Sequence, residues 1–210
     1  MKTVRLIDVS KHYGKRVVLN NLNFSFDKGL YLVTGENGIG KSTLLKIIYG
    51  ISKPTSGRVV NKGDTSYLPE RLKIPNFVTV TEFLRIMLEL KTNTNDYMYI
   101  EDSINRYLES FSIYKYKNYK MNTLSKGTDQ KIMIIYTLIN NGDLYLFDEP
   151  LNGLDYNSQM VFISILGELI DNNKVIIIST HYISAYDSLD RTILSIDNIT
   201  KGIVVNYETV

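Results

Sequence analysis

A glycine-rich segment of eight residues, Gly35 to Ser42, stands between an apolar run and a segment of helix length. It reads Gly-Glu-Asn-Gly-Ile-Gly-Lys-Ser, which fits the pattern G-x-x-x-x-G-K-[ST]. The run before it, Leu30–Val33, is typical of a buried strand, and apolar residues recur at helical spacing after it. Glycines in such a loop let backbone N–H groups surround an anion at the start of the helix. The segment therefore predicts a phosphate-binding turn between a strand and a helix.

Three more apolar runs of strand length follow, at Leu144–Phe147, Val175–Ile178 and Ile193–Ile196. Such runs are typical of strands buried on both faces, and the helix-length segments between them indicate a parallel sheet. Near the N-terminus apolar and polar residues alternate instead, as at Val4 and Leu6, which favours half-buried antiparallel strands. We therefore predict an α/β fold: a P-loop NTPase core of mostly parallel strands with an N-terminal antiparallel β layer.

The stretch from about residue 76 to residue 122 contains no strand-like run and shows helical spacing of apolar residues, as at Phe83 and Leu90. We interpret it as a helical subdomain inserted into the α/β body. A chain of 210 residues has the size of one domain, so we predict a single domain over 1–210. Within it, residues 1–75 and 123–210 are expected to form the nucleotide-binding core.

Composition excludes several other classes of protein. The chain has no cysteine, so neither a disulfide framework nor a thiolate metal site is available to it. The formal net charge of +2 is too small to indicate nucleic-acid binding by itself. No apolar run reaches the roughly 18 residues of a membrane span, and the first residues lack the apolar core of a signal peptide. We expect a soluble protein that stays where it is made.

Two carboxylates end the apolar run Leu144–Phe147, and they match the chemistry expected of the glycine-rich segment. Lys41 is placed to reach the β- and γ-phosphates of a nucleotide, and the hydroxyl of Ser42 to ligate Mg²⁺. Asp148 would hold the same ion from a neighbouring strand. Glu149 would lie beside the γ-phosphate, where it could orient and polarise an attacking water. Because ligands bind at the carboxyl edge of open α/β sheets, both carboxylates are candidate site residues.

With these motifs the chain resembles the nucleotide-binding subunits of the ATP-binding cassette (ABC) family, from end to end. Leu124-Ser125-Lys126-Gly127-Thr128 resembles the family signature, and Leu151-Asn152-Gly153-Leu154-Asp155 resembles its D-loop. Ser179-Thr180-His181 follows an apolar run and resembles the segment of the switch histidine. Tyr13 falls where the family stacks an aromatic ring on adenine.

The resemblance implies ATP and Mg²⁺ as cofactors, with Glu149, His181 and Lys41 as catalytic residues. The residues expected to hold ATP are Tyr13, Gly35, Glu36, Asn37, Gly38, Ile39, Gly40, Lys41, Ser42, Thr43, Ser125 and Gly127. Those expected to hold the metal are Ser42, Glu70 and Asp148.

The resemblance also implies partners. Two cassettes, identical or related, would face each other with ATP between the P-loop of one and the signature of the other, so that ATP binding closes the dimer. An integral-membrane permease on a separate chain would hold the subunit at the inner, cytoplasmic face of the cell membrane. Tyr67-Leu68-Pro69-Glu70 resembles the exporter branch, whose cargoes are drugs, peptides or polysaccharides.

Two departures from the family pattern stand out. Glu70 occupies the place of the Q-loop glutamine; both side chains offer an oxygen to Mg²⁺ or water, although Glu70 could equally face solvent. Lys126 and Thr128 replace a glycine and a glutamine of the signature, while Ser125 and Gly127 keep the expected contact positions.

Other interpretations stay open. A soluble ABC ATPase acting in cofactor assembly or another non-transport role has the same motifs, and a P-loop kinase or GTPase shares the phosphate loop. Asn61-Lys62-Gly63-Asp64 fits a guanine-reading motif, but it lies far before Asp148, and we interpret it as a hairpin turn. The basic-aromatic run from Tyr114 to Lys120 could stack single-stranded bases, yet such runs are usually solvated, and we expect no nucleic-acid partner.

Overall fold

The computed structural model describes residues 4–70, 77–92, 97–197 and 200–208. Contacts along the chain divide it into two compact units. The core unit is made of Met1–Glu70, Gly142–Glu149 and Leu166–Val210, and the helical unit of Arg71–Asn141 and Pro150–Ile165. The boundary predicted between residues 75 and 76 lies outside the described residues, and the predicted domain ranges stay a prediction.

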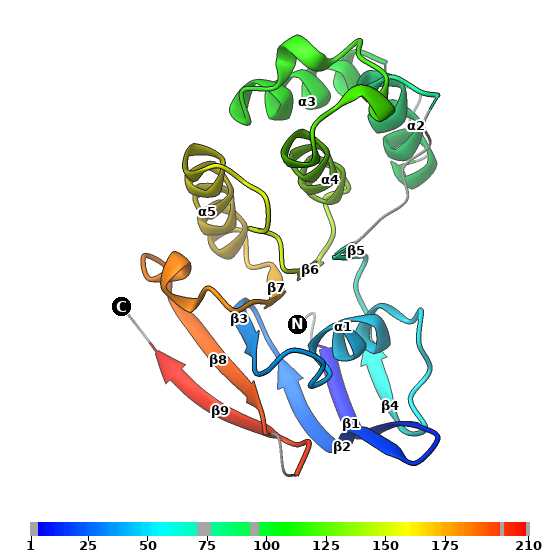
Figure 1. Cartoon of the computed structure of the whole chain (residues 1–210), viewed down its shortest axis with the longest axis vertical. Helices are drawn as coiled ribbons and strands as arrows, with labels where there is room; N and C mark the ends of the chain where they lie inside the picture. Colours follow the sequence, from blue (N-terminus) through cyan, green and yellow to red (C-terminus); the bar gives the residue numbers. More distant parts are fainter. Residues whose placement is uncertain (1–3, 71–76, 93–96, 198–199, 209–210) are drawn as a thin grey trace. The chain divides into compact units, whose positions relative to one another are not determined.

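A six-stranded sheet with the order β5-β6-β7-β3-β8-β9 runs through the described part of the core unit (Figure 1). Its strands are β3 (Gly29–Thr34), β5 (Thr65–Leu68), β6 (Leu144–Asp148), β7 (Val175–Ser179), β8 (Arg191–Ile196) and β9 (Ile203–Glu208). All neighbours from β5 to β8 are parallel, and β9 pairs antiparallel with β8. Every residue of β6 and β7 is buried, as expected for central strands. The predicted core of mostly parallel strands is confirmed.

A second sheet has three strands in the order β2-β1-β4 among the described residues. These strands are β1 (Val4–Tyr13), β2 (Arg16–Phe26) and β4 (Ser56–Asn61), and both pairings are antiparallel. This sheet is the predicted N-terminal antiparallel β layer, which is confirmed.

The hairpin predicted at Gly63 is wrong. The strand before it, β4, pairs with β1, whereas the strand after it, β5, pairs in parallel with β6 of the other sheet. The segment is a crossing between two sheets, and Asn61 shapes it. Its Oδ1 accepts the N–H of Gly63 at 3.0 Å, and its Nδ2 donates to Thr65 Oγ1 at 2.7 Å. The sequence correctly predicted a turn at these residues. It did not predict which strands β4 and β5 pair with, because that depends on residues far along the chain.

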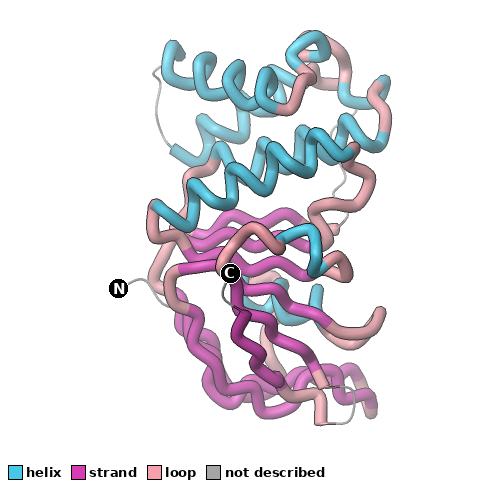
Figure 2. Tube along the Cα trace, turned by 90° about the vertical axis from the view of Figure 1, so that its left-hand side faces the viewer, coloured by secondary structure: helices cyan, strands magenta, loops and turns pink. Residues whose placement is uncertain are grey.

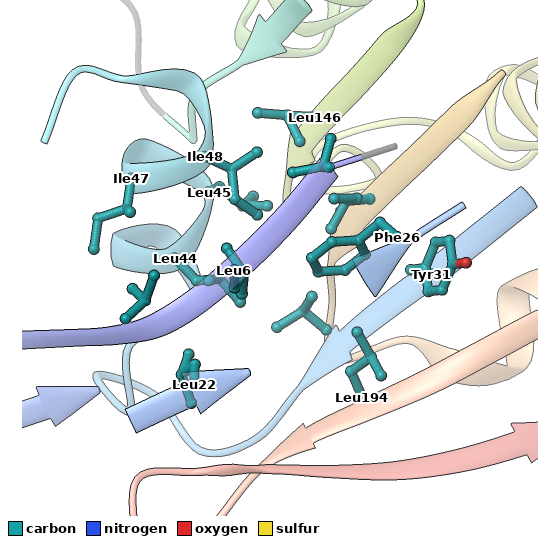
Figure 3. Packing of buried hydrophobic residues seen from close by; sticks show 14 of the residues in the cluster. Leu6, Leu22, Phe26, Tyr31, Leu44, Leu45, Ile47, Ile48, Leu146 and Leu194 are labelled. Atoms are coloured by element: carbon teal, nitrogen blue, oxygen red, sulfur yellow. The ribbon is translucent and has the colours of Figure 1, made fainter. Parts of the chain in front are cut away.

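The hydrophobic core of the core unit lies between the two sheets and α1 (Lys41–Tyr49), as Figure 3 shows. Leucines come from each of the three layers, and Phe26 and Tyr31 pack edge to face with centroids 5.1 Å apart. The leucines labelled in the figure are Leu6, Leu22, Leu44, Leu45, Leu146 and Leu194. Because α1 is held from both sides, the loop that precedes it has a fixed position against the sheet.

The helical unit contains α2 (Val80–Thr92), α3 (Tyr97–Ser110) and α4 (Lys126–Ile139), which contact one another as a bundle (Figure 2). Short 3₁₀ turns η1 (Tyr114–Tyr116) and η2 (Met121–Thr123) join α3 to α4. This arrangement confirms the predicted helical subdomain. Helix α5 (Tyr156–Asp171) begins in this unit, and the 3₁₀ turn η3 (Ile183–Tyr186) belongs to the core unit. Among the described residues, no helix is long and apolar enough to cross a lipid bilayer.

Candidate active site

The glycine-rich loop connects β3 to α1 in a conformation that only glycine adopts readily. Gly35, Gly38 and Gly40 have φ angles of 135°, 74° and 133°. A Cβ at Gly40 would also lie 3.0 Å from the side chain of Val18. The loop can therefore pass this close to β2 only because position 40 has no Cβ. The loop ends at Lys41, where α1 begins, so the free N–H groups of the first helical turn face the loop. The arrangement suits a bound anion.

Lys41 is buried, with an exposed fraction of 7%, and its ammonium group is fully occupied. The Nζ atom donates to the carbonyl oxygens of Gly35 at 2.8 Å and Glu36 at 3.2 Å, and it contacts His181 Nε2 at 2.9 Å. Burial lowers the pKa of Lys41, while the charges of Glu149 and Asp148 oppose that shift. The Lys41 ammonium group therefore lies against the backbone of the loop, with acidic groups nearby.

Three adjacent parallel strands bring the predicted polar groups to one sheet edge. The strands β6, β7 and β3 are consecutive in the sheet, and each ends at a segment with candidate residues. Asp148 ends β6 and is 2% exposed. Its Oδ1 atom accepts a hydrogen bond from Ser42 Oγ at 3.0 Å. The hydroxyl and the carboxylate together form a set of hard oxygen ligands that could hold Mg²⁺.

Glu149 and His181 lie beside Lys41. Glu149 Oε1 is 3.3 Å from His181 Nε2, and this Nε2 also lies 2.9 Å from Lys41 Nζ. Burial raises the pKa of Glu149, against the opposing charges of His181 and Lys41 and the backbone N–H of His181. A carboxylate held in this way is a stronger base than an exposed one, which suits proton abstraction from water.

Tyr13 ends β1 and lies near the glycine-rich loop through its strand partner. It pairs with Arg16 across the turn into β2, and Arg16 Nη2 donates to the carbonyl oxygen of Gly38 at 2.8 Å. The Tyr13 ring is 55% exposed, with Lys11 Nζ 5.0 Å from its centroid. An accessible ring in this place could stack on a base.

The remaining predicted residues of the core unit differ in exposure. Glu36, Asn37 and Gly38 are exposed at the loop tip, whereas Ile39 and Gly40 are buried, and Ser42 and Thr43 are half-buried. Glu70 is exposed beyond the end of β5 and belongs to no described hydrogen bond with Ser42 or Asp148. Its charge nevertheless contributes to raising the pKa of Lys41 against the effect of burial.

Ser125 and Gly127 belong to the helical unit, at the start of α4. Ser125 caps this helix, because its Oγ accepts the Thr128 N–H at 3.2 Å and contacts Thr128 Oγ1 at 2.9 Å. A Cβ at Gly127 would lie 2.9 Å from the carbonyl oxygen of Gly153. The signature-like turn thus packs directly on the D-loop-like segment.

Two side-chain contacts reinforce that packing. Gln130 Nε2 donates to the carbonyl oxygen of Pro150 at 3.0 Å, and Lys131 Nζ lies 2.6 Å from Asp155 Oδ2. Asp155 also caps α5 by accepting the Ser158 N–H at 2.9 Å. The Lys131 ammonium first, and then this N–H, lower the pKa of Asp155 to about 2. The two segments form one connected body within the helical unit.

The basic-aromatic run carries internal contacts. Lys117 Nζ lies 4.3 Å from the centroid of the Tyr114 ring and donates to its hydroxyl at 2.6 Å. Lys115 lies 5.0 Å from the centroid of Tyr116. Two of the aromatic rings on which bases could stack therefore have an ammonium group within 5.0 Å. The absence of a nucleic-acid partner stays a prediction.

Sequence reasoning did not single out two residues that contact the site. Arg16 reaches the glycine-rich loop from β2, and Ser179, at the end of β7, contacts the carboxylate of Asp148 and the backbone N–H of Glu149. From the sequence alone, Ser179 was named only as part of the segment Ser179-Thr180-His181. The signal for its role is the strand register, which pairs Ser179 with Asp148 and appears only once the sheet order is known.

Comparison with known proteins points to one family. A sequence profile described as "ABC transporter" matches residues 19–152. An uncharacterized ABC transporter ATP-binding protein of Methanocaldococcus jannaschii is 32% identical over 206 residues, covering 97% of this chain and 76% of the relative. A zinc import ATP-binding protein of Rickettsia conorii is 32% identical, with coverages of 76% and 67%. A lantibiotic transport ATP-binding protein of Streptococcus pyogenes is 30% identical, with coverages of 89% and 83%.

A solved structure supports the fold. The chain superposes on the dimeric structure of a bacterial ABC transporter cassette with a TM-score of 0.86, over 97% of this chain and 98% of the other, at 22% identity. The profile match and the archaeal relative extend over most of the chain, and the loop, carboxylates and histidine lie within a matching fold. The chain therefore belongs to the ABC transporter family, as an ATP-binding subunit that hydrolyses ATP.

Proposed function

We propose that this chain powers an exporter by binding and hydrolysing Mg²⁺-ATP at the sheet edge formed by β6, β7 and β3. One observation carries the proposal: the ends of three consecutive strands bring Lys41, Asp148 with Glu149, and His181 together. A cation for phosphates, a carboxylate pair and a histidine are the groups that phosphoryl transfer to water requires.

Each of these groups has a role that its surroundings support. The loop N–H groups, the start of α1 and Lys41 would bind the phosphates, and Tyr13 would stack on the adenine. Glu149 would accept a proton from the attacking water, helped by its raised pKa. His181 would contact the γ-phosphate after giving up its contact with Lys41.

Ser42 and Asp148 fit a magnesium ion, because their side-chain oxygens already lie 3.0 Å apart. The ion would neutralise charge on the phosphate oxygens when bound. Glu70 would contribute a further oxygen. It is exposed and therefore free to take up such a position.

A second copy would complete each site. The start of α4, with Ser125 and the Gly127 N–H, would bind the γ-phosphate held by the partner's P-loop. ATP would then be part of the interface, so that binding closes the dimer and hydrolysis opens it. The dimeric cassette of similar fold supports this arrangement.

The membrane partner would be a permease on a separate chain, and it would hold this subunit at the inner, cytoplasmic face of the membrane. The named relatives include a zinc import protein and a lantibiotic transport protein. We favour export of drugs, peptides or polysaccharides, because the Tyr-Leu-Pro-Glu segment at residues 67–70 resembles that of the exporter branch.

The first test uses Glu149→Gln. We expect ATP hydrolysis to fall by roughly 10²- to 10⁴-fold while ATP binding persists, because only the proton acceptor is lost. The variant should retain ATP and elute as a dimer in size-exclusion chromatography with light scattering. Glu109→Gln, at an exposed position of α3, is the matched control and should behave as wild type. A Glu149→Gln chain that binds ATP and stays monomeric would contradict the dimer mechanism.

The transport role needs a separate experiment. The chain would be captured from its source cells in mild detergent, and its partners identified by mass spectrometry. A multi-span membrane protein in equal amount is the expected result. A soluble partner, with the chain missing from the membranes, would keep the ATPase assignment and overturn the transporter role.

A further inference from the structure

Ser179 is the last residue of β7 and lies at the centre of the site. Its register partners are Asp148 on one side and Val33, next to the glycine-rich loop, on the other. We propose that Ser179 is a positioning residue that fixes both catalytic carboxylate residues through its hydroxyl group. The inference rests on the proposed function, because it concerns the same Mg²⁺-ATP site.

The hydroxyl of Ser179 contacts both carboxylate residues at once. Its Oγ donates to Asp148 Oδ1 at 2.5 Å and accepts the backbone N–H of Glu149 at 3.2 Å. A serine hydroxyl has one proton and two lone pairs, so these two bonds use its proton and one lone pair. The side chain is fully buried, with an exposed fraction of 0%, so water cannot replace either bond.

Asp148 is thereby held by hydroxyl groups from two different elements. Ser42 donates to Oδ1 from α1, and Ser179 donates to the same oxygen from β7. Ser42 is itself an expected metal ligand, whereas Ser179 is expected to act only through the carboxylate. The direction in which Asp148 presents its oxygens therefore depends on a residue that would touch neither metal nor nucleotide.

Glu149 needs such a support because of its backbone. Its φ of 51° lies in the left-handed region, which residues other than glycine seldom adopt. The Glu149 N–H is shared between the carbonyl oxygen of Ser179 at 3.0 Å and its Oγ at 3.2 Å. These two acceptors stabilise the turn that directs the side chain of Glu149 toward Lys41 and His181. Ser179 thus links the orientation of the expected base to that of the expected metal ligand.

Replacement of Ser179 by alanine tests this positioning role, because we expect the chain to fold as the wild type does. The backbone pairing of β7 does not involve the side chain, so the sheet keeps its register. Ser195→Ala is a matched control, because Ser195 Oγ shares a hydrogen bond of 2.9 Å with Thr34 Oγ1 in the same sheet. Ser179→Cys is a second variant that keeps the shape but supplies only a weak donor.

The experiment measures binding of a fluorescent ATP analogue against Mg²⁺ concentration, and the kcat and KM of hydrolysis. For Ser179→Ala we expect about tenfold more Mg²⁺ at half-maximal binding and a kcat at least about tenfold lower, as for the loss of a hydrogen bond to a charged group. Binding in excess chelator and the KM at saturating Mg²⁺ should stay within about twofold of wild type. Ser179→Cys should change in the same direction, and Ser195→Ala should not change.

Two outcomes would overturn the proposal. One is a Ser179→Ala or Ser179→Cys chain with the Mg²⁺ requirement and kcat of wild type. The other is an equal loss in Ser195→Ala, which would point to a general effect of removing a hydrogen-bonded hydroxyl from this sheet. Failure of the proposed function would look different, since the wild-type chain itself would then show no Mg²⁺-dependent binding of the analogue.

Discussion

Glu149 combines two opposing demands in a single side chain. Its carboxyl group is 11% exposed, and burial raises its pKa. The raised pKa suits a group that must accept a proton from water. The same burial makes the charged form unfavourable in the folded chain, so the residue lowers the free energy of unfolding at neutral pH.

This opposition predicts a pH-dependent stability difference between the nucleotide-free wild type and Glu149→Gln. Because the folded pKa of Glu149 lies above its unfolded value, the wild type loses stability as pH rises from about 4.5 through the folded pKa. Glutamine does not titrate. We therefore expect Glu149→Gln to have the higher Tm at pH 8 and this advantage to shrink as the pH falls toward 4, in thermal unfolding without nucleotide. A difference that does not vary with pH would contradict the assignment of burial as the cause.

At the scale of secondary-structure elements, two contacts tie loops to the elements beside them. Arg16 of β2 holds the carbonyl oxygen of Gly38, and Asp155 joins the start of α5 to Lys131 of α4. Both contacts involve a charged group, which makes a stronger hydrogen bond than a neutral one. The side chains of Arg16 and Asp155 can each be replaced without changing a residue that is expected to take part in hydrolysis.

Removal of the Arg16 side chain should weaken ATP binding. In Arg16→Ala the strand pairing with Tyr13 remains, but the glycine-rich loop loses its link to β2. We expect the Kd for ATP to rise about fivefold, which corresponds to a hydrogen bond of about 1 kcal/mol. Lys15→Ala, in the same turn, is the control and should bind as wild type in the same titration.

Asp155→Ala should destabilise the chain by about 1 kcal/mol at pH 7, because α5 loses its cap. The folded pKa of Asp155, about 2, lies below the unfolded value, so its contribution is present above about pH 4 and is lost as the pH falls toward 2. Asp155→Asn keeps the capping oxygen and should lose less. Urea unfolding at pH 7 compares the three chains, and equal midpoints for all of them would exclude a capping role.

The elements that the sequence predicted correctly are those with local signals. The apolar runs that became β3, β6, β7 and β8 follow from burial on both faces, and Gly35–Ser42 follows from the backbone angles that a loop around an anion requires. The strand β9 was missed, because its apolar stretch is too short to be told from a loop. The error at Gly63 and the missed role of Ser179 share one cause: strand partners are set by distant residues.

At the scale of the whole molecule, the expected nucleotide contacts divide between the two units. The P-loop, both carboxylates and His181 belong to the core unit, and the signature-like turn to the helical unit. In the proposed dimer the core unit of one copy binds the nucleotide first. Ligand binding to the folded form then stabilises the chain by mass action.

ATP with Mg²⁺ should therefore raise the Tm of the wild type. At a ligand concentration of 100 times the Kd the gain is about 2.7 kcal/mol, or roughly 5–11 °C for a chain of this size. Lys41→Ala should show little of this shift, because the loop loses the ammonium group expected to bind the phosphates. Lys46→Ala, exposed on the same helix, serves as the control in thermal-shift measurements. An equal shift in Lys41→Ala would show that ATP stabilises the chain elsewhere.

The three groups in contact with the ammonium of Lys41 also affect which anions can bind to the loop. The Lys41 ammonium group already contacts the carbonyl oxygens of Gly35 and Glu36 and the Nε2 atom of His181. An incoming phosphate must displace one of them. Inorganic phosphate offsets that exchange only through the loop N–H groups and the start of α1, whereas a nucleotide adds contacts of its base and ribose. We therefore expect the loop to bind a nucleotide more tightly than inorganic phosphate.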